Sequence, residues 1–563
     1  MPFSNKPFLA QPVLETALID CVICGYNDTD YEQYSNALKL TQRFSGAYHT
    51  VLSNSVLDGI TRLPYMDLLN QTLWDVTNTN PKLHICNLPN LGVSYLKNYL
   101  LKWNMSVEII NFFSEQKEEL IRLLASNPLS LAITTTFYTT LTPIIEIVEF
   151  VRAANSTVKI IVGGPFIFNL CAKNDVSKVD ATLSRIGADI YVHDSQGERT
   201  LVDVINALKN GGSLDDVANI LHRTKGKTFK SAQTRLLLTN NAIRRTRRIE
   251  ENNEMDKYSV DWRNFPDKHF VPTVQMRTAR SCAYKCAFCC YPIMAGELSL
   301  TNLDVIEKEM IYLKSRGVEN IVFIDDTFNI PQNRFKDLCK MMIRNKFNFN
   351  WFSYFRASNA DKESIHLTAE SGCKGVFLGI ESGDQDILNK MNKAVKVEKY
   401  ISGIQELNRL GVFTFVSLIV GYPGETSRSV TNSIQFLRDA KPSGFRAELY
   451  FHSTNTPVHD QAEQYQLVGE GYSWRHASLR WQDAVNELVQ MYSSVTDCPV
   501  VAEHMFDFWS LPYLIGKGMT KNDYEAFIKA AHPFLVRSMK DEPFDPLPYK
   551  VKLREALADV RLR

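Results

Sequence analysis

Two patterns of apolar and polar positions alternate in the second half of the chain. Short apolar runs of strand length are separated by longer stretches in which apolar residues recur at helical spacing, as in residues 303–315. This alternation is typical of βαβ units, whose strands lie parallel in one sheet. We predict six such strands, at residues 271–276, 320–325, 350–354, 375–380, 412–420 and 446–451.

A block between residues 80 and 200 shows the same alternation, and its predicted strands are residues 83–87, 106–112, 129–134, 159–162 and 189–192. Residues 460–563 instead combine helical spacing with many aromatic side chains. We therefore expect an α/β protein with several domains. They are an N-terminal extension (1–78), a doubly wound, Rossmann-like domain (79–210), a charged linker (211–267), a partial (β/α)6 barrel (268–458) and a helical C-terminal domain (459–563) that closes the open side of the barrel.

Composition and charge narrow the class of protein. The 63 Lys and Arg residues nearly cancel the 62 Asp and Glu residues, which gives no indication of a nucleic-acid or anionic-membrane partner. No apolar run reaches the roughly 18 residues of a membrane span, and the first residues lack the plan of a signal peptide. The 11 cysteines, an odd number, then indicate reduced thiols. We expect a cytoplasmic protein.

Three cysteines, Cys282, Cys286 and Cys289, follow the first predicted barrel strand with the spacing C-x3-C-x2-C. They supply one thiolate fewer than a [4Fe–4S] cluster takes when every ligand is a cysteine. One iron is then free to bind another molecule, and iron–sulfur radical chemistry with S-adenosylmethionine (SAM) uses such a vacancy. The alternatives are a zinc knuckle, core cysteines or chance. Zinc would require a fourth Cys or His at ligand spacing, and none lies nearby in the sequence.

Polar and glycine-rich motifs follow the next four predicted strands. Because ligands gather at the carboxyl ends of parallel strands, we expect these motifs to line one site. Taken singly, each has a structural alternative: a tight turn, a helix cap or a surface charge. The motifs are Asp325 with Asp326, Arg356, the Gly-Ile-Glu-Ser-Gly run at 379–383 and the Gly-Tyr-Pro-Gly-Glu-Thr run at 421–426.

The cysteine loop, the run 379–393 and the turn 421–426 together resemble the radical SAM superfamily, whose enzymes have partial (β/α)6 barrels. The resemblance implies that the three cysteines hold a [4Fe–4S] cluster and that SAM binds beside it. It also implies contacts to SAM: Phe288 supports the adenine, and Glu381 and Ser382 approach the ribose or the amino acid part. Ser417 and the neighbouring backbone, including Gly421, line the adenosine pocket.

One motif departs from the common family pattern. Asp325 and Asp326 stand where a Gly-Gly-Glu-type signature often ends the second strand. This variant is familiar in the cobalamin-linked subgroup, and by the resemblance both residues belong to the SAM site. The departure leaves open which group holds the SAM ammonium.

The block at 80–200 resembles the cobalamin-binding domain found upstream of many radical SAM enzymes. The matching segments are a strand that ends in Gly163 and Gly164 and the run 187–201, which contains Glu198. Paired glycines let the backbone approach a flat ligand, and the threonine-rich strand end at 134–140, with Thr135, offers hydroxyl groups. The resemblance implies that these residues contact cobalamin. The alternative is a flavodoxin-like interaction domain with ordinary turns.

Other motifs bear on that cofactor. The histidine motif D-x-H-x-x-G, which supplies an axial ligand in other cobalamin domains, is absent from the sequence, and His84 stands alone. We therefore predict a core or surface role for His84 and a corrinoid whose lower face meets no such histidine. No phosphate-loop motif supports a nucleotide instead.

Two further cysteine features are predicted to be structural. Cys290 directly follows the last cysteine of the motif, and we interpret it as a small buried side chain rather than a ligand. Cys21 and Cys24 form a C-x2-C pair without a partner pair, inside an apolar run of strand character, which favours a core position over a metal site.

The resemblance implies a cobalamin-dependent radical SAM methyltransferase that acts on an unactivated carbon or phosphorus centre. The subgroup it resembles most is that of the phosphinate P-methyltransferases, which suggests natural-product or peptide biosynthesis. A small-molecule or peptide substrate and an electron donor such as flavodoxin or ferredoxin are the implied partners. Two alternatives stay open: a non-methylating cobalamin radical SAM enzyme (ring contraction or cyclisation), and a non-enzymatic corrinoid or iron–sulfur protein.

Overall fold

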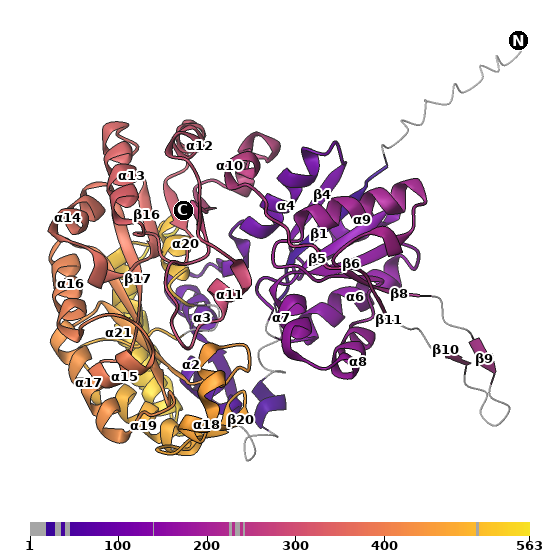
Figure 1. Cartoon of the computed structure of the whole chain (residues 1–563). Coiled ribbons are helices and arrows are strands. Elements are labelled where there is room, and N and C mark those ends of the chain that lie inside the picture. Colours follow the sequence, from indigo (N-terminus) through magenta and orange to yellow (C-terminus); the bar gives the residue numbers. More distant parts are fainter. Residues whose placement is uncertain are drawn as a thin grey trace, which may run out of the picture. The chain divides into compact units, whose positions relative to one another are not determined.

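The computed structural model describes residues 18–28, 35–39, 46–138, 140–224, 228–230, 237–239, 243–502 and 506–563. Residues 1–17 of the predicted extension and Thr139 of the threonine-rich strand end lie outside them. The chain divides into two compact units (Figure 1). The smaller is Met1–Gly25, Leu96–Phe168 and Val176–Glu251, and the larger is Tyr26–Tyr95, Asn169–Asp175 and Asn252–Arg563.

A seven-stranded sheet forms the centre of the smaller unit, with the order β11-β8-β7-β6-β5-β1-β4. β5 pairs in parallel with both β1 and β6, and β6 pairs in parallel with β7. The strands are β1 (Cys21–Tyr26), β4 (Val107–Phe112), β5 (Ser130–Thr134), β6 (Lys159–Gly163), β7 (Ile190–Val192), β8 (Ile220–Arg223) and β11 (Ile243–Arg245). The α-helices that lie wholly within this unit are α5 (Lys117–Ala125), α6 (Thr142–Ala154), α8 (Val176–Ile186) and α9 (Glu198–Asn210).

The predicted first strand of this sheet, residues 83–87, is wrong. Residues Ile85–Asn87 form a 3₁₀ turn (η1), whose start is capped by the His84 side chain: its Nδ1 accepts the Cys86 N–H at 3.1 Å. The strand that pairs with β5 is β1, from the segment assigned to the N-terminal extension. Every residue of β1 is buried, and such a strand shows no alternation to mark it in a sequence.

Four strands lie within the predicted linker at 211–267. β9 (Thr228–Lys230) and β10 (Leu237–Thr239) form a separate antiparallel pair. β8 and β11 run antiparallel to their neighbours and extend the seven-stranded sheet at one edge. Charged side chains typify an exposed edge strand, and this composition concealed β11 in the sequence. Arg244 pairs with Asp215, and Arg245 pairs with Asp180 at 2.5 Å.

The larger unit contains the predicted barrel sheet, with six parallel strands in the order β12-β15-β16-β17-β18-β19. All six predicted strands are confirmed within a few residues. They are β12 (Thr273–Met276), β15 (Asn320–Phe323), β16 (Asn350–Tyr354), β17 (Cys373–Glu381), β18 (Phe413–Val420) and β19 (Gly444–Leu449).

Helices lie along one face of this sheet, and neighbouring helices pack side by side around it (Figure 1). Their amphipathic spacing leaves one apolar side for the sheet and one polar side for water. The predicted helix at 303–315 is confirmed as α12. The series is α12 (Leu303–Ser315), α13 (Gln332–Arg344), α14 (Lys362–Glu370), α15 (Gln385–Lys390), α16 (Val397–Arg409) and α17 (Ser427–Ala440).

The other face of the sheet is covered by aromatic residues from the C-terminal region. Phe508 lies 5.9 Å from Phe377 and 6.1 Å from Phe415, ring centre to ring centre, and Trp509 lies 4.8 Å from Tyr354. The helical character predicted for this region is confirmed, with one short hairpin. Its elements are α18 (Ala462–Tyr465), β20 (Val468–Glu470), β21 (Ser473–Arg475), α19 (Trp481–Ser494), α20 (Ser510–Gly516), α21 (Lys521–Ser538) and α22 (Leu547–Ala556).

The rest of the predicted N-terminal extension belongs to the larger unit. Arg62 forms an ion pair with Asp541 at 2.6 Å, and the Leu57 N–H donates to the Ser538 hydroxyl, so this segment packs on α21 and its end. It consists of α2 (Ala47–Asn54), the hairpin β2 (Ser55–Asp58) and β3 (Thr61–Pro64), and α3 (Tyr65–Thr77). Among the described residues, no helix is both long and apolar enough to cross a membrane.

Candidate active site

The cysteine loop follows the first strand of the six-stranded sheet. After β12, a short pair of strands, β13 (Ala279–Arg280) and β14 (Ser299–Leu300), closes the base of the loop. Cys286 is buried, and Cys282 and Cys289 are partly exposed. Burial raises the pKa of Cys289 to about 12, and the neighbouring thiols of Cys290, Cys286 and Cys282 act in the same direction.

Two buried cations lie near this loop. Burial raises the pKa of the Cys286 thiol, while Lys393 and Arg356 act in the opposite direction. Lys393 and Arg356 are only 6% and 7% exposed. A cluster held by three thiolates is an anion, so both the donor set and the surrounding charge fit a [4Fe–4S] cluster. No three His, Cys, Asp or Glu side chains in the described ranges are grouped to bind a single metal ion; the thiolates of a cubane cluster bond separate irons.

Phe288 and Glu381 are brought together by Lys393. The Lys393 ammonium lies 5.4 Å from the centre of the Phe288 ring and 3.4 Å from Glu381 Oε1, and it donates to the Gly379 carbonyl at 2.8 Å. Glu381 ends β17 with φ of 70°, a conformation that costs free energy for a residue with a side chain. Backbone strain of this kind is concentrated at functional sites. Phe288 and Glu381, two of the residues predicted to contact SAM, thus both lie near the Lys393 ammonium.

The two predicted aspartates have different surroundings. Asp325 is 1% exposed and accepts hydrogen bonds from the Thr278 N–H at 2.6 Å and the Ala279 N–H at 3.0 Å. It therefore holds the chain just before the cysteine loop. Asp326 is partly exposed, and burial raises its pKa to about 7 against the effect of a hydrogen bond from Tyr291.

Ser382 and Gly421 make contacts with other parts of the protein. The Ser382 hydroxyl is fully buried and accepts the Asp384 N–H at 3.1 Å. Gly421 has φ of 93°, and a Cβ there would lie 2.4 Å from the Trp474 ring. Trp474 can pack against this turn only because position 421 has no side chain.

Ser417 lies beside a cation that the sequence analysis missed. The register pairs Ser417 with Gly379 on β17 and with Arg446 on β19, and Arg446 Nε lies 3.3 Å from the Ser417 hydroxyl. The guanidinium of Arg446 lies 5.4 Å from the centre of Phe377. Lys393 was also missed. Lys393 lies beyond the carboxyl end of a predicted strand, which was an available signal, but many surface lysines share it. Arg446 is the first residue of the predicted strand 446–451, where no such signal marked it.

In the smaller unit, Thr135, Gly163 and Gly164 meet at the ends of β5 and β6. The Thr135 hydroxyl donates to the Gly163 carbonyl at 2.8 Å, and a Cβ on Gly164 would lie 2.9 Å from that hydroxyl. Glu198, also predicted here, is buried in the first turn of α9. The N–H groups of that turn are capped by Glu251, which accepts from Thr200 N at 2.7 Å, so a protein carboxylate already occupies this helix terminus.

The remaining cysteine and histidine predictions have clear outcomes. Cys21 and Cys24 are 0% exposed in β1, and burial raises the pKa of each to about 12, which confirms the core interpretation. Cys290 is partly exposed, so the prediction that it is buried is wrong; it precedes the short helix α11 (Tyr291–Ala295). His84 Nε2 lies 3.0 Å from Asp28, and its other ring nitrogen caps η1, which confirms a structural role.

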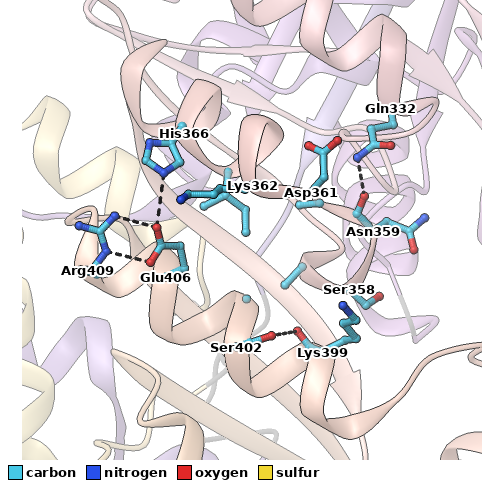
Figure 2. Close-up of a pocket in the computed structure, with 14 residues that line it drawn as sticks. Gln332, Ser358, Asn359, Asp361, Lys362, His366, Lys399, Ser402, Glu406 and Arg409 are labelled. Atoms are coloured by element: carbon cyan, nitrogen blue, oxygen red, sulfur yellow. Dashed lines mark hydrogen bonds and ion pairs between the residues drawn. The ribbon is translucent and has the colours of Figure 1, made fainter.

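A pocket of about 800 Å³ lies beside the barrel, among α14, α16 and the turn η5 (Ala357–Asn359) (Figure 2). Its lining contains none of the predicted site residues. Glu406 is held between Arg409 at 2.7 Å and His366 at 3.5 Å, as Figure 2 shows. Such paired surface charges contribute little to stability and do not define a ligand.

The turn at 421–426 yields a prediction on pH. Glu425 is 1% exposed, its carboxylate accepts the Gly421 N–H, and burial raises its pKa from 4.5 to about 8. The folded state thus binds this proton more tightly than the unfolded state. The resulting stabilisation of the folded protein is complete at pH values below the pKa that Glu425 has in the unfolded state. It is lost as the pH rises through the pKa that Glu425 has in the folded state.

We expect the free energy of unfolding of the wild type to fall, relative to Glu425→Gln, by up to about 1.4 kcal/mol per pH unit between about pH 5 and pH 8. Urea unfolding of both proteins at the two ends of this range measures the effect. A difference between the two proteins that stays constant with pH would contradict it.

Comparisons with known proteins give the class of the chain. Residues 276–437 match the model of the radical SAM superfamily. A protein of Pyrococcus horikoshii named "uncharacterized methyltransferase" is 23% identical over 62% of this chain and 73% of its own length. The tryptophan 2-C-methyltransferase of Streptomyces laurentii is 25% identical over 30% of this chain and 31% of its own length.

Two solved structures share the fold. TsrM from Kitasatospora setae, a radical SAM methyltransferase with cobalamin and a [4Fe–4S] cluster bound, has a TM-score of 0.58 at 16% identity, over 81% of this chain and 97% of that chain. The cobalamin-dependent SAM radical enzyme OxsB has a TM-score of 0.54 at 16% identity, over 83% and 72% of the two chains.

A parallel six-stranded sheet with a C-x3-C-x2-C loop after its first strand defines a partial-barrel iron–sulfur enzyme. The match over residues 276–437 is more specific: this part of the chain is a radical SAM domain, which implies a [4Fe–4S] cluster and SAM as its cofactors. The fold found in TsrM extends over 81% of this chain, and the fold found in OxsB extends over 83%.

Proposed function

We propose that this chain is a cobalamin-dependent radical SAM methyltransferase that acts on an unactivated carbon or phosphorus centre. The observation that carries the proposal is the combination of the cysteine loop and its buried cations with an upstream seven-stranded α/β sheet. TsrM, which shares this fold over 81% of the chain, is a methyltransferase with cobalamin bound. The names of the two sequence relatives agree with methyl transfer.

The chain's residues have distinct roles in this proposal. Cys282, Cys286 and Cys289 hold the cluster, Phe288, Glu381 and Ser417 contact SAM, and Asp325 and Ser382 act through the loops that they brace. Thr135, Gly163 and Gly164 present backbone and hydroxyl groups to the corrinoid. When bound, the cluster and SAM supply radical chemistry, and cobalamin supplies the methyl group.

The proposal includes partners. Reductive cleavage of SAM consumes an electron that neither SAM nor a closed-shell substrate supplies, so a protein such as flavodoxin or ferredoxin is the proposed donor. The tryptophan substrate named for TsrM motivates a small-molecule or peptide substrate here. We propose natural-product or peptide biosynthesis in the cytoplasm as the setting.

The test is a cofactor count. Protein purified without oxygen, reconstituted with iron, sulfide and hydroxocobalamin and freed of excess, is expected to hold about four irons and one cobalt per chain. A control without hydroxocobalamin corrects for adventitious cobalt. Four irons without cobalt would refute the cobalamin-dependent reaction, and the smaller unit would then serve another purpose.

OxsB, which shares the fold, is described as a cobalamin-dependent SAM radical enzyme without mention of methyl transfer, so a non-methylating reaction is tested as well. Methyl transfer with a second SAM that restores the methyl group yields S-adenosylhomocysteine as well as 5′-deoxyadenosine. Ring contraction or cyclisation yields 5′-deoxyadenosine alone. Turnover with a panel of small molecules and peptides, with both products quantified, distinguishes the two reactions.

A further inference from the structure

Four exposed lysines lie on the cysteine loop and on the segments that flank the pocket beside the barrel. Lys362 on α14 and Lys399 on α16 line the pocket (Figure 2). Lys396 is the N-cap residue of α16, and Lys285 belongs to the cysteine loop. All four residues are exposed, and within the described ranges none of their ammonium groups forms an ion pair. We call these four residues the lysine group.

The pocket is connected to the cysteine loop by hydrogen bonds. Asn359, which lines the pocket, donates from Nδ2 to the hydroxyl of Tyr284, a residue inside the C-x3-C-x2-C motif. On the other side, the Lys285 carbonyl accepts from Asn392 Nδ2 at 2.7 Å, and Asn392 precedes the turn that leads into α16. The lysine group and the cluster ligands therefore belong to one local region of the larger unit.

The two acidic residues that line the pocket already have partners. Asp361 pairs with Lys336 at 2.6 Å, and Glu406 pairs with Arg409 at 2.7 Å. Glu398 on α16 is exposed and forms no ion pair in the part of the chain that the structure describes. The four lysines thus exceed the nearby unpaired acid in charge. Because the whole chain has a net charge of only +1, this positive surface is a local feature.

We propose that the lysine group is the docking surface for the electron donor and that the donor is an acidic flavodoxin. The inference rests on the proposed function and adds the place where the electron enters. Positive charge without internal counter-charge attracts an acidic protein over a long range and orients it before contact. The hollow between α14 and α16 receives a protruding group. The exposed edge of the flavin protrudes from a flavodoxin, whereas the cluster of a ferredoxin lies beneath its surface.

The docked complex transfers one electron. The flavodoxin hydroquinone is oxidised to the semiquinone, and the oxidised cluster gains the electron, so no bond between the two proteins forms or breaks. Lys285 directly precedes the cluster ligand Cys286 in the sequence. A flavin held at this surface therefore approaches the cluster closely. Redox partners of this kind meet through small interfaces and depend on charge for a fast encounter.

The experiment measures how fast a flavodoxin hydroquinone reduces the cluster-loaded protein in a stopped-flow instrument without oxygen. The double variant Lys362→Glu with Lys399→Glu reverses two charges and leaves the cysteine loop intact. We expect its second-order rate constant to fall about 10- to 100-fold at low ionic strength. This difference should shrink as salt is added, because salt screens exposed charges. The matched control reverses Lys308 on α12 and Lys374 at the start of β17, which are exposed and do not line the pocket, and it should lose far less.

Photoreduced deazaflavin, a small neutral reductant, should reduce the wild type and both double variants at the same rate. Iron content and the visible spectrum of each protein report separately on the cluster. An unchanged rate with flavodoxin in Lys362→Glu with Lys399→Glu would overturn the inference, and so would an equal loss in the two double variants, which would reflect net charge alone. A loss that appears equally with deazaflavin would assign these lysines a structural role and also overturn it. Reduction of the wild type by an acidic ferredoxin but not by flavodoxin would show that the donor is wrong.

The proposed function fails by a different result. If deazaflavin reduced the cluster of the wild type but SAM was then not cleaved, the radical SAM methyltransferase would fall, whatever the rate with flavodoxin. A slow reaction with flavodoxin together with normal SAM cleavage after deazaflavin would instead sink only the docking surface.

Discussion

Replacement of Cys286 by alanine is expected to abolish both the cluster and SAM cleavage. Only three cysteines of the loop are available to hold about four irons, and each thiolate bonds a different iron. Removal of Cys286, which interacts electrostatically with Lys393 and Arg356, leaves two ligands and takes one thiolate away from these two cations. We expect iron per chain to fall to background after reconstitution, with the absorption of the cluster, and 5′-deoxyadenosine formation to become undetectable.

Cys290→Ala is the matched control. Cys290 belongs to the same loop region, is partly exposed and directly follows Cys289. It is expected to retain wild-type iron content and SAM cleavage. If Cys290→Ala lost iron while Cys286→Ala kept it, the ligand set would be wrong. Full biological activity of Cys286→Ala would favour a non-enzymatic protein.

The barrel strands could be predicted because each is a buried run between helices with clear amphipathic spacing. Residues 83–87 have the same apolar character, but prolines at positions 81 and 89 flank them and the His84 side chain caps a turn, so local hydrogen bonds replace sheet pairing. β1 lies at a distance in sequence from its partner β5, and no local pattern records which partner a buried strand takes. The charged edge strand β11 has the composition of a linker.

The sequence predicted that the site residues lie at the ends of the strands, but it did not predict their contacts. Asp325 and Asp326 are adjacent in sequence, yet one is enclosed by backbone N–H groups and the other is partly exposed. That difference arises from the path of the chain at Thr278, which is set by tertiary structure. Likewise, Arg446 reaches Ser417 only through the register of β18 and β19.

Asp325→Ala is expected to destabilise the larger unit and release the cysteine loop. Asp325 is 1% exposed and holds the Thr278 and Ala279 N–H groups. Alanine would leave both donors buried without partners, at about 1–3 kcal/mol each, and would also leave a small cavity. We expect a loss of about 3 kcal/mol or more in the free energy of unfolding, measured by urea titration followed by tryptophan fluorescence.

Asp326→Ala separates this bracing role from a contact to SAM. Asp326 is partly exposed, and its side chain is hydrogen-bonded to Tyr291. Its removal should therefore lower the free energy of unfolding by about 1 kcal/mol, the net value of one ordinary hydrogen bond. Iron retention should follow the same order, because the turn at Thr278 and Ala279 sets the start of the cysteine loop: Asp325→Ala loses iron under conditions in which Asp326→Ala keeps it. A larger loss of stability in Asp326→Ala would show that the loop is braced elsewhere. If Asp325→Ala kept both its stability and its iron but lost SAM binding, Asp325 would be a ligand of SAM after all, and its enclosed hydrogen bonds would have to open to admit it.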